Sequence, residues 1–525
     1  MLVLCPPGGA PNRWENRHAA SIGVVKRRQD SCVVRSTPAG TRVGMPVRQE
    51  DKGMFDAMAD FFTAGGLRHA EAEFWSFNRL PGVSLPVVAC LAALLACSGV
   101  HTARAQVIDQ YINADIPGYG GEAGVTVATR AHPEYEAQGV RLGQFVITPV
   151  LAESIGYDDN VTGTPQAHGS ALIETNLNVG VVGGWSDTRF GGSVMVDDFQ
   201  YPQQSNQGFT NWTGALGVSH DFGRDTFDIG YTHLGLNQTP RDLNVPGLDQ
   251  TIAYQVDDIR ADYRLDLGRI AVMPAVDVSY YNNFENGVVR GVPYLQSYRD
   301  RIVVQPSVQA SYEFATRRRV VVVVRDTQAD FDRSPPAMPR QNFNDVSALG
   351  GLAYDADGII GFRLLGGYER RSFSSAMYRT IQAPIIESAI TWTPTGLTTV
   401  TGTAARYIED SAAEATVGYT ETALKLNLDH EYLRNLVLSA RAAYYMDSYS
   451  RGINNIGGGS QNFITGGLGA AYKFNRNLRL AANYTYSNRN SSAGAVAPTA
   501  FLQTGEVFGG NFSENLFTLT LRFAL

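Results

Sequence analysis

Charged side chains recur at every second position in several stretches of this chain. Between Ile259 and Leu267, arginine and aspartate alternate with apolar residues, and similar stretches follow near 360–371, 421–429 and 478–487. This spacing puts charge on one face of a β-strand and apolar groups on the other. Facing rings of opposite charge inside a channel order water and filter solutes. The candidate pore-lining residues are Arg260, Asp262, Arg264, Asp266, Arg363, Glu369, Arg371, Lys425, Asp429, Arg441, Asp447 and Arg479.

Two other interpretations compete with a pore lining: ion pairing among these charges, and enzymatic chemistry. The charges could pair with one another and close the interior. An enzyme would need a nucleophile with a base, but His132, His168, His220, His233 and His430 are scattered and none follows a nucleophile-elbow pattern. They have no metal-ligand spacing either. We therefore predict no catalytic, cofactor-binding or metal-binding residue.

Composition excludes further classes. The 525 residues carry a net charge of −7, so a basic nucleic-acid surface is not expected. All four cysteines, the last being Cys97, precede residue 98, so the rest of the chain holds no disulfide and no thiolate site. After residue 100 no apolar run reaches the length of a membrane-spanning helix.

The alternating segments are joined by eight short turns and nine longer, polar loops, which predicts 18 strands, with 16–18 as the range. Short turns at one end and long loops at the other are typical of outer-membrane barrels. Closure removes the open edges that lipid does not tolerate. The fold prediction is an all-β, closed antiparallel transmembrane β-barrel. A soluble β-propeller would place four strands in each period of this length, where two are seen.

Four prolines oppose this prediction. Pro149, Pro274, Pro306 and Pro384 fall inside proposed strands, where proline removes a ladder hydrogen bond. We expect them at strand starts near the short-turn rim. Seven tyrosines are expected at the membrane interfaces: Tyr157, Tyr201, Tyr231, Tyr280, Tyr368, Tyr407 and Tyr444.

The last strand carries a specific local pattern. Apolar or aromatic residues occupy every second position to the final residue, at Phe517, Leu519, Leu521, Phe523 and Leu525. Barrel-assembly machinery would read such a strand by β-augmentation. We predict a C-terminal assembly signal, with Leu525 in place of the usual terminal phenylalanine.

A secretory signal is predicted at residues 83–105. Leu85–Val100 is uncharged, and Ala103 and Ala105 form the small-x-small pattern of a cleavage site. A buried core helix and lipidation at Cys97 are the alternatives. Residues 1–82 are irregular and are interpreted as a mis-called start or a cytoplasmic extension. Residues 106–143 are expected to form a small periplasmic segment, and 144–525 the barrel.

Four segments, taken in order, resemble the putative β-barrel porins of alphaproteobacterial outer membranes (the second porin-like family). They are Ile155–Val161, Thr391–Thr401, Leu428–Leu438 and Tyr472–Leu480, and the resemblance covers about 144–525. It implies a bacterial outer-membrane barrel of porin type, and for some members an association with exopolysaccharide export. It supplies no catalytic residues.

The predicted function is a porin-like channel for small solutes or an exopolysaccharide-export-associated pore. The alternative is a non-conducting structural or adhesive barrel. Predicted partners are outer-membrane lipid, the barrel-assembly machinery, and small solutes or polysaccharide, with no nucleic acid; the oligomeric state is not predicted.

Overall fold

The computed structural model describes residues 111, 116–119, 126–127, 130, 132–245, 247–289, 291–335, 338–356, 359–411, 416–450, 458–492 and 509–525. The predictions for 1–82 and for the signal peptide at 83–105, with Ala103 and Ala105, lie outside these residues.

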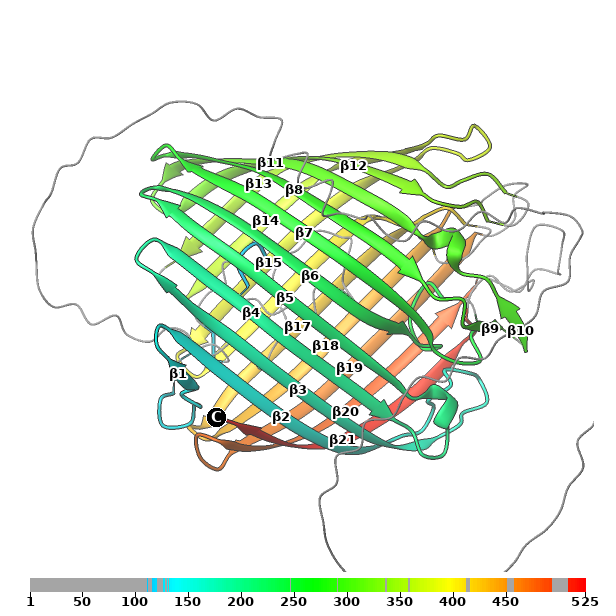
Figure 1. Ribbon diagram of the computed structural model, residues 1–525, viewed down its shortest axis with the longest axis horizontal. Coiled ribbons are helices and arrows are strands. Elements are labelled where there is room, and N and C mark those ends of the chain that lie inside the picture. The colour runs from blue at the N-terminus through cyan, green and yellow to red at the C-terminus, as the bar shows by residue number, and fades with distance from the viewer. Residues whose placement is uncertain are drawn as a thin grey trace, which may run out of the picture. The chain divides into compact units, whose positions relative to one another are not determined.

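The wall is a single closed ring of antiparallel strands (Figure 1). Each long strand pairs with its neighbours in sequence, and β2 (Phe145–Asp158) also pairs with β21 (Phe512–Ala524), which closes the ring. Within the described residues this ring has 18 strands, so the predicted fold class and strand number are confirmed. In the part of the chain that the structure describes, the regular structure apart from strands is two short 3₁₀ turns, η1 (Ser205–Gln207) and η2 (Ser297–Arg299).

The other sixteen strands of the ring follow in chain order. They are β3 (Ser170–Trp185), β4 (Thr188–Gln200), β5 (Phe209–Phe222), β6 (Asp225–Gln238), β7 (Ile252–Asp266), β8 (Ile270–Asn283), β11 (Arg301–Ala315), β12 (Arg318–Phe331), β13 (Phe343–Ala356), β14 (Ile360–Phe373), β15 (Ile381–Thr395), β16 (Thr398–Glu409), β17 (Tyr419–Leu433), β18 (Leu436–Tyr449), β19 (Gly459–Lys473) and β20 (Leu478–Ser491). Three-residue strands lie beside the ring: β1 (Val140–Leu142) pairs with the start of β2, and β9 (Gly287–Val289) pairs with β10 (Val292–Tyr294).

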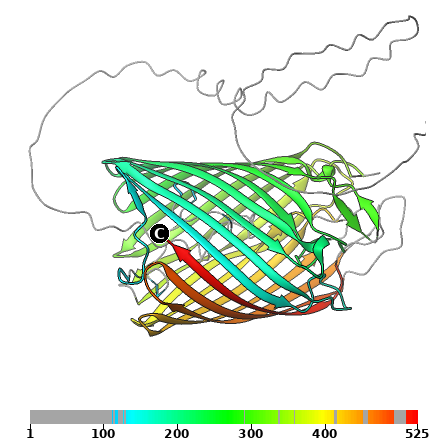
Figure 2. The same cartoon turned by 60° about the horizontal axis from the view of Figure 1, so that its bottom comes forward.

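The two faces of the wall differ in chemistry. Successive side chains of a strand point to opposite faces, and here the large exposed apolar residues, such as Leu216, Leu426 and Leu468, all belong to one alternation. The other alternation carries buried polar and charged residues, such as Asp258 and Glu369. Because the ring is closed (Figure 2), the first face is the outer surface and the second faces the interior.

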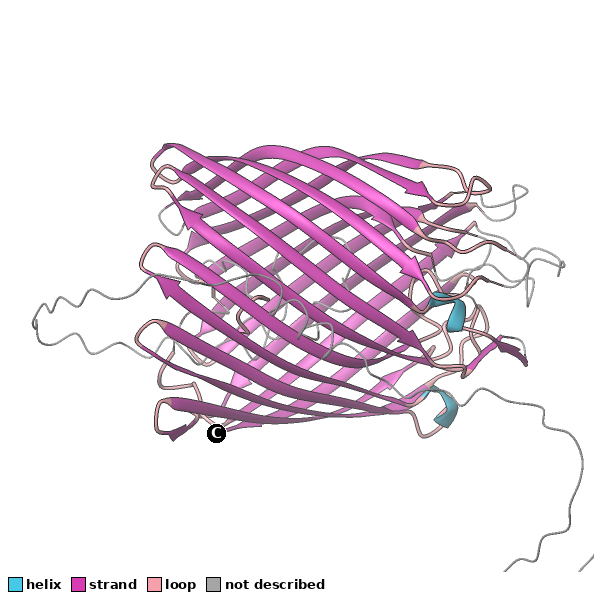
Figure 3. Ribbon diagram, turned by 45° about the horizontal axis from the view of Figure 1, so that its top comes forward, coloured by secondary structure: helices cyan, strands magenta, loops and turns pink. Residues whose placement is uncertain are grey.

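The ends of the barrel also differ. Figure 3 shows tight turns at one end, here called the short-turn end, and longer connections at the other, the long-loop end. One such turn joins β3 to β4, and the C-terminus lies at the same end. The connection from β6 to β7, residues 239–251, is among the longer ones.

Five of the seven predicted tyrosines are exposed on the outer face: Tyr157, Tyr231, Tyr280, Tyr368 and Tyr444. Tyr231 lies in the middle of β6, so the expected place at a membrane interface stays a prediction. The prediction is wrong for Tyr201 and Tyr407, which are buried. Tyr201 accepts a hydrogen bond from Arg241, and Tyr407 donates one to Glu421, so both phenols are used inside.

The four prolines lie within strands, but only two occupy the expected place. Pro149 and Pro274 lie near the short-turn starts of β2 and β8, whereas Pro306 and Pro384 lie towards the long-loop ends of β11 and β15. Pro384 pairs with Tyr368 of β14, but the β15–β16 ladder begins two residues later, at Ile386–Arg406. The β15–β16 ladder therefore has a gap, here called the seam, on the long-loop side of Ile386.

Side chains close that seam. The Ile408 N–H donates to Glu369 Oε2 (3.0 Å), and Ile408 O accepts from Arg371 Nη2 (2.8 Å). The backbone groups that a proline cannot pair are thus satisfied by two charged residues of β14, as burial requires.

The C-terminal strand is held at its last residues. Leu525 N–H donates to Pro149 O (3.2 Å) and Ala524 N–H to Asn477 O (2.9 Å). Phe517, Leu521, Phe523 and Leu525 are exposed on the outer side. This arrangement fits the predicted assembly signal, whose reading by an assembly machine stays a prediction.

Deleting Phe523, Ala524 and Leu525 is expected to prevent barrel formation in cells. The deletion removes the final rung of the closing β20–β21 ladder and the exposed aromatic repeat. Heat-modifiable migration of the outer-membrane fraction in gels measures the folded barrel, and we expect it to fall to a trace. A Ser513→Ala control at the other end of β21 should fold normally; equal folding of the deletion would contradict the predicted signal.

Candidate pore

The twelve residues predicted to line a pore all belong to the inward alternation. They come from β7, β14, β17, β18 and β20, and each pairs across the sheet with another inward position. Their surroundings differ, however. Arg441 is exposed to the interior, whereas Arg371 and Asp447 are buried within the wall and its lining. The alternation therefore identifies the face, while the contacts decide which residues remain open to solutes.

A network of ion pairs covers the inner face from β12 to β16. Arg371 Nε lies 2.9 Å from Asp345 Oδ2, and Arg371 Nη1 lies 2.5 Å from Asp410 Oδ1. Arg325 forms a bidentate pair with Glu387, at 2.5 and 3.0 Å. In this region the charges pair with one another, as Arg325 does with Glu387 and Arg371 with Asp345 and Asp410.

Sequence reasoning missed Arg325, Asp345 and Glu387. Arg325 follows the run Val320–Val324, which has no apolar–polar alternation to mark its faces. The register of β12 with β13 would have been needed to place it.

A second cluster lies on the inner face of β7 and β8. Arg260 Nε lies 2.6 Å from Asp277 Oδ2 and 3.2 Å from Asp258 Oδ1. The Arg260 guanidinium also lies 4.8 Å from the ring centroid of Tyr119, which precedes the barrel in sequence. Arg260 therefore connects the wall to a segment inside it.

The described residues between 111 and 139 (111, 116–119, 126–127, 130 and 132–139), here called the lumen segment, contact the inner wall at several points. Ile116 is fully buried among Ala215, Leu234 and Val256, and the Tyr119 hydroxyl donates to Asp258 O (2.8 Å). Burying an isoleucine side chain contributes roughly 1.5–3 kcal/mol. Burial raises the pKa of the Tyr119 phenol. Ile116 and Tyr119 thus lie against the inner face of β5–β7; the periplasmic segment expected at 106–143 stays a prediction.

Two glycines of the wall leave the space in which the lumen segment packs. Gly217 of β5 and Gly230 of β6 are directly paired across the sheet. A Cβ atom on Gly230 would lie 2.5 Å from the Tyr119 ring and 2.6 Å from Pro117 O, and one on Gly217 would overlap Pro117. The pair, here called the glycine notch, lets backbone approach backbone, a use that only glycine allows.

Farther along, the lumen segment reaches a different part of the wall. Val127 N–H donates to Thr399 Oγ1 of β16 (2.9 Å), and His132 Nε2 lies 3.3 Å from Glu431 Oε2 of β17. Gly139 N–H donates to Leu525 O (3.1 Å). The segment thus contacts the ring at β5–β7 and again at β16–β17, at least seven strand positions apart in either direction.

Loop 239–251 occupies the long-loop end in a similar way. It starts from β6, yet Arg489 of β20 donates from Nη1 to three consecutive carbonyls, those of Pro240 (3.2 Å), Arg241 (3.2 Å) and Asp242 (2.8 Å). Arg489 is almost wholly buried, with Nε donating to Gly510 O (2.9 Å). The loop is therefore drawn inward across the ring rather than outward.

Loop 239–251 also contacts the wall through its own arginine, Arg241. Arg241 Nη1 lies 2.7 Å from Glu514 Oε1 and also pairs with Asp158, while Nη2 donates to the Tyr201 hydroxyl (3.0 Å). Burial alone would lower the pKa of Arg241, but the two carboxylates raise it above its ordinary value. Arg241 therefore stays charged, which fastens the loop to β2 and β21.

A cationic row lies at the short-turn end. Lys473, Arg479 and Arg522 are successive cross-strand partners on β19, β20 and β21, all on the inner face. Arg479 was predicted to line the pore; Lys473 and Arg522 were not, although their alternation with exposed Tyr472 and Phe523 marks them as inward.

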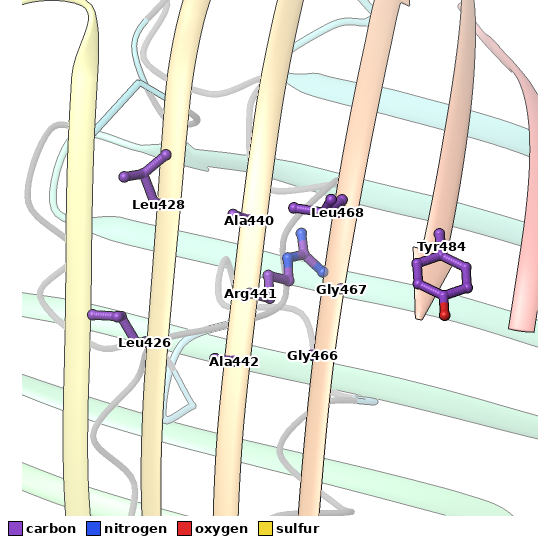
Figure 4. A pocket seen from close by; sticks show the side chains of 9 residues that line it. All are labelled: Leu426, Leu428, Ala440, Arg441, Ala442, Gly466, Gly467, Leu468 and Tyr484. Carbon is purple, nitrogen blue, oxygen red and sulfur yellow. The ribbon is translucent and has the colours of Figure 1, made fainter. Parts of the chain in front are cut away.

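One hollow lies on the outer side of the wall. It measures about 460 Å³ and lies over β17–β20, with Leu426, Leu428, Leu468 and Tyr484 around the small residues Ala440, Ala442 and Gly466 (Figure 4). Leu468 and Leu426 are more than half exposed. Most of the hollow is therefore lined by outward residues, although Arg441 of the inner face also borders it.

The histidines serve local contacts. His220 Nδ1 lies 2.8 Å from Thr188 Oγ1 and His430 Nδ1 lies 2.9 Å from Thr398 Oγ1, both at short turns. In the part of the chain that the structure describes, no group of three or more His, Cys, Asp or Glu could hold a metal ion. No described helix is long and apolar enough to cross a membrane.

Comparison with known proteins gives one family. The family described as "putative beta-barrel porin 2" matches residues 132–501. No curated protein matches the chain.

Several solved structures are similar to this chain at low identity and with TM-scores below 0.5. The FrpB iron transporter of Neisseria meningitidis is 8% identical, covering 74% of this chain and 82% of its own, with a TM-score of 0.39. OpdO of Pseudomonas aeruginosa is 12% identical over 73% and 98%, with a TM-score of 0.38. The outer-membrane protein opdK of the same organism is 11% identical over 72% and 99%, with a TM-score of 0.37.

Proposed function

The chain belongs to the putative beta-barrel porin 2 family of outer-membrane barrels, and on that premise we propose that it is a channel for small polar solutes. One observation carries this proposal: a closed ring of 18 strands presents its charged residues inward and its apolar residues outward. A ring of this size is wide enough for an aqueous channel. The protein lies in the bacterial outer membrane, where such a face contacts lipid.

The solute path would follow the inner residues that the ion-pair network leaves open. Arg441 of β18 is exposed to the interior, and so is Asn483 of β20, two strands away. On β7, Arg264 and Asp266 lie partly exposed near the short-turn end. We propose these positions, rather than the buried Arg371 and Asp447, as the lining that solutes meet.

A second candidate function also has an observation in its favour. The lumen segment and loop 239–251 both lie inside the ring and are fastened to its wall. Such contents would fit a non-conducting structural barrel. They equally fit a narrow channel in which the contents select solutes.

Planar-bilayer recording of the mature chain from Gln106 separates these two candidates. We expect small ohmic steps in potassium chloride, since the contents narrow the path without filling a ring of this size. A folded barrel, verified by heat-modifiable migration, that gives no steps would overturn the channel and support the structural function.

Export of exopolysaccharide is a separate proposal, which derives only from the family resemblance. Measurement of secreted polymer in a deletion strain, with the gene restored as control, tests it. Unchanged polymer would restrict the function to small solutes.

A further inference from the structure

The lumen segment is held at its second contact by charged side chains. His132 Nε2 lies 3.3 Å from Glu431 Oε2 of β17, and Arg130 Nη1 lies 3.9 Å from the same oxygen. On the neighbouring strand β16, Thr399 Oγ1 accepts from the Val127 N–H (2.9 Å). His132 and Glu431, here called the latch pair, thus join the segment to a wall residue about 300 positions later in the chain.

The latch pair is shielded from water. The side chains of His132 and Glu431 are 13% and 5% exposed, and Glu431 Oε2 accepts no hydrogen bond from the described residues. A buried carboxylate oxygen is costly unless a positive charge or a donor lies beside it. Arg130 is the farther cation, and its Nη1 also donates to Gly396 O in the β15–β16 turn. The strength of this contact therefore depends on whether His132 carries a charge.

Other ionisable groups surround the latch pair from the segment and from the wall. They are Arg130, Glu134 and Glu136 on the lumen segment, Asp429 on β17, Arg434 at the β17–β18 turn, Lys473 on β19 and Arg479 on β20. Of these side-chain types and histidine, only histidine ordinarily changes its charge between pH 5 and 8. A change of pH within this range therefore acts on the contact through His132.

We propose that the latch pair is a proton-controlled latch. Protonation of His132 adds an ion pair with Glu431 that holds the lumen segment against β16–β17, and loss of that proton loosens the segment there. Acidic medium therefore narrows the channel, and neutral or alkaline medium widens it. The effect on conductance rests on the proposed function, whereas the attachment itself can be measured without it.

The direction follows from the charge of each state. In acid both ring nitrogens of a histidine carry hydrogen, so a positive charge lies 3.3 Å from the Glu431 carboxylate. In alkali the ring is neutral, and Arg130 is left as the cation beside that oxygen. The glycine notch and the Gly139 N–H bond to Leu525 O involve no histidine, so they persist in both states. The segment is therefore loosened between these two attachments and is not expelled.

The first test measures attachment without transport. Amide hydrogen exchange of the peptide that contains Val127 is followed by mass spectrometry in the detergent-solubilised barrel. Variants are compared at the same pH, so that the intrinsic exchange rate cancels. At about pH 5, His132→Gln and Glu431→Gln are expected to exchange several-fold faster than the unchanged chain. At about pH 8 the unchanged chain and His132→Gln should exchange alike.

Two further variants make this test specific. His430→Gln is the matched control, since His430 precedes Glu431 but its Nδ1 lies 2.9 Å from Thr398 Oγ1. It should keep the behaviour of the unchanged chain at both pH values. His132→Lys carries its charge at both values and should exchange slowly at both. Equal exchange of the unchanged chain and His132→Gln at about pH 5 would overturn the latch, as would loss of the pH response in His430→Gln.

The second test records single-channel conductance in potassium chloride at the same two pH values. The unchanged chain is expected to conduct several-fold less in acid, His132→Gln to keep the larger conductance at both values, and His132→Lys the smaller. Conducting barrels that all respond alike to pH would overturn the control of the channel by the latch and leave the channel standing. A barrel whose Val127 exchange responds as expected but that never conducts would overturn the channel and leave the latch standing.

Discussion

Replacing Gly230 with valine is expected to release the lumen segment and raise the single-channel conductance several-fold. The new side chain would start 2.5 Å from the Tyr119 ring and 2.6 Å from Pro117 O, and the second of these atoms belongs to the backbone and cannot turn aside. Loss of the notch also removes Ile116 from its apolar site against β5–β7. The cross-section that the segment fills then becomes available to ions.

The matched control is Gly214→Val on the neighbouring β5, because a Cβ atom there meets nothing within 4 Å. It should leave conductance unchanged. Deleting residues 106–136 should reproduce the valine effect. A folded Gly230→Val barrel with unaltered conductance would show that the segment does not obstruct the ion path.

Arg489→Ala is expected to free loop 239–251 and to lower the free energy of unfolding by about 3 kcal/mol or more. Hydrogen bonds to charged groups contribute about 1.5–3 kcal/mol each and are not additive, and this one guanidinium serves five carbonyl groups. Its removal leaves buried carbonyls without a donor. It also removes a cation–π contact with Phe512, at 4.6 Å.

Limited proteolysis measures directly whether loop 239–251 has been released from the wall. Arg241 is only partly exposed and is held between Asp158 and Glu514, so trypsin should not cut after it in the parent barrel. In Arg489→Ala we expect cleavage there, seen by mass spectrometry, and a lower midpoint of thermal unfolding. Arg489→Lys should behave in an intermediate way, because an ammonium group cannot reach all five carbonyls.

Arg318→Ala, an exposed arginine at a short turn, serves as the control and should change the free energy of unfolding by no more than about 0.5 kcal/mol. Resistance of Arg489→Ala to trypsin at Arg241 would mean that Arg241 and its carboxylates hold the loop without help.

The faces and the strand number could be predicted because they follow from local spacing. Alternation along β7 or β20 is a property of neighbouring residues, and lipid on one side enforces it. The same reasoning placed all twelve candidate residues on the inner face. It could not separate exposed Arg441 from buried Arg371, because that difference depends on Asp345 and Asp410, which are far from Arg371 in the chain.

For the same reason, the sequence could not predict that loop 239–251 and the lumen segment lie inside the ring. A polar, glycine- and proline-containing loop such as 239–251 has the same composition whether it turns outward or inward. Its direction is decided by Arg489, about 250 residues later. Likewise Ile116–Tyr119 has no periodicity of its own, and only the pairing of Gly217 with Gly230 shows where it fits.

The pairing of β2 with β21 also constrains the order of events during assembly. These strands lie at opposite ends of the barrel sequence, so the ring stays open until the last residues have been added to it. Ile116–Tyr119 precedes β2 and is enclosed by the finished ring. If Ile116–Tyr119 binds the inner face while the strands still form an open sheet, the chain does not have to be threaded through a closed ring. The lumen segment is therefore enclosed when the ring closes. The pairing of β21 with β2 thus both completes the wall and fixes which segment stays inside it.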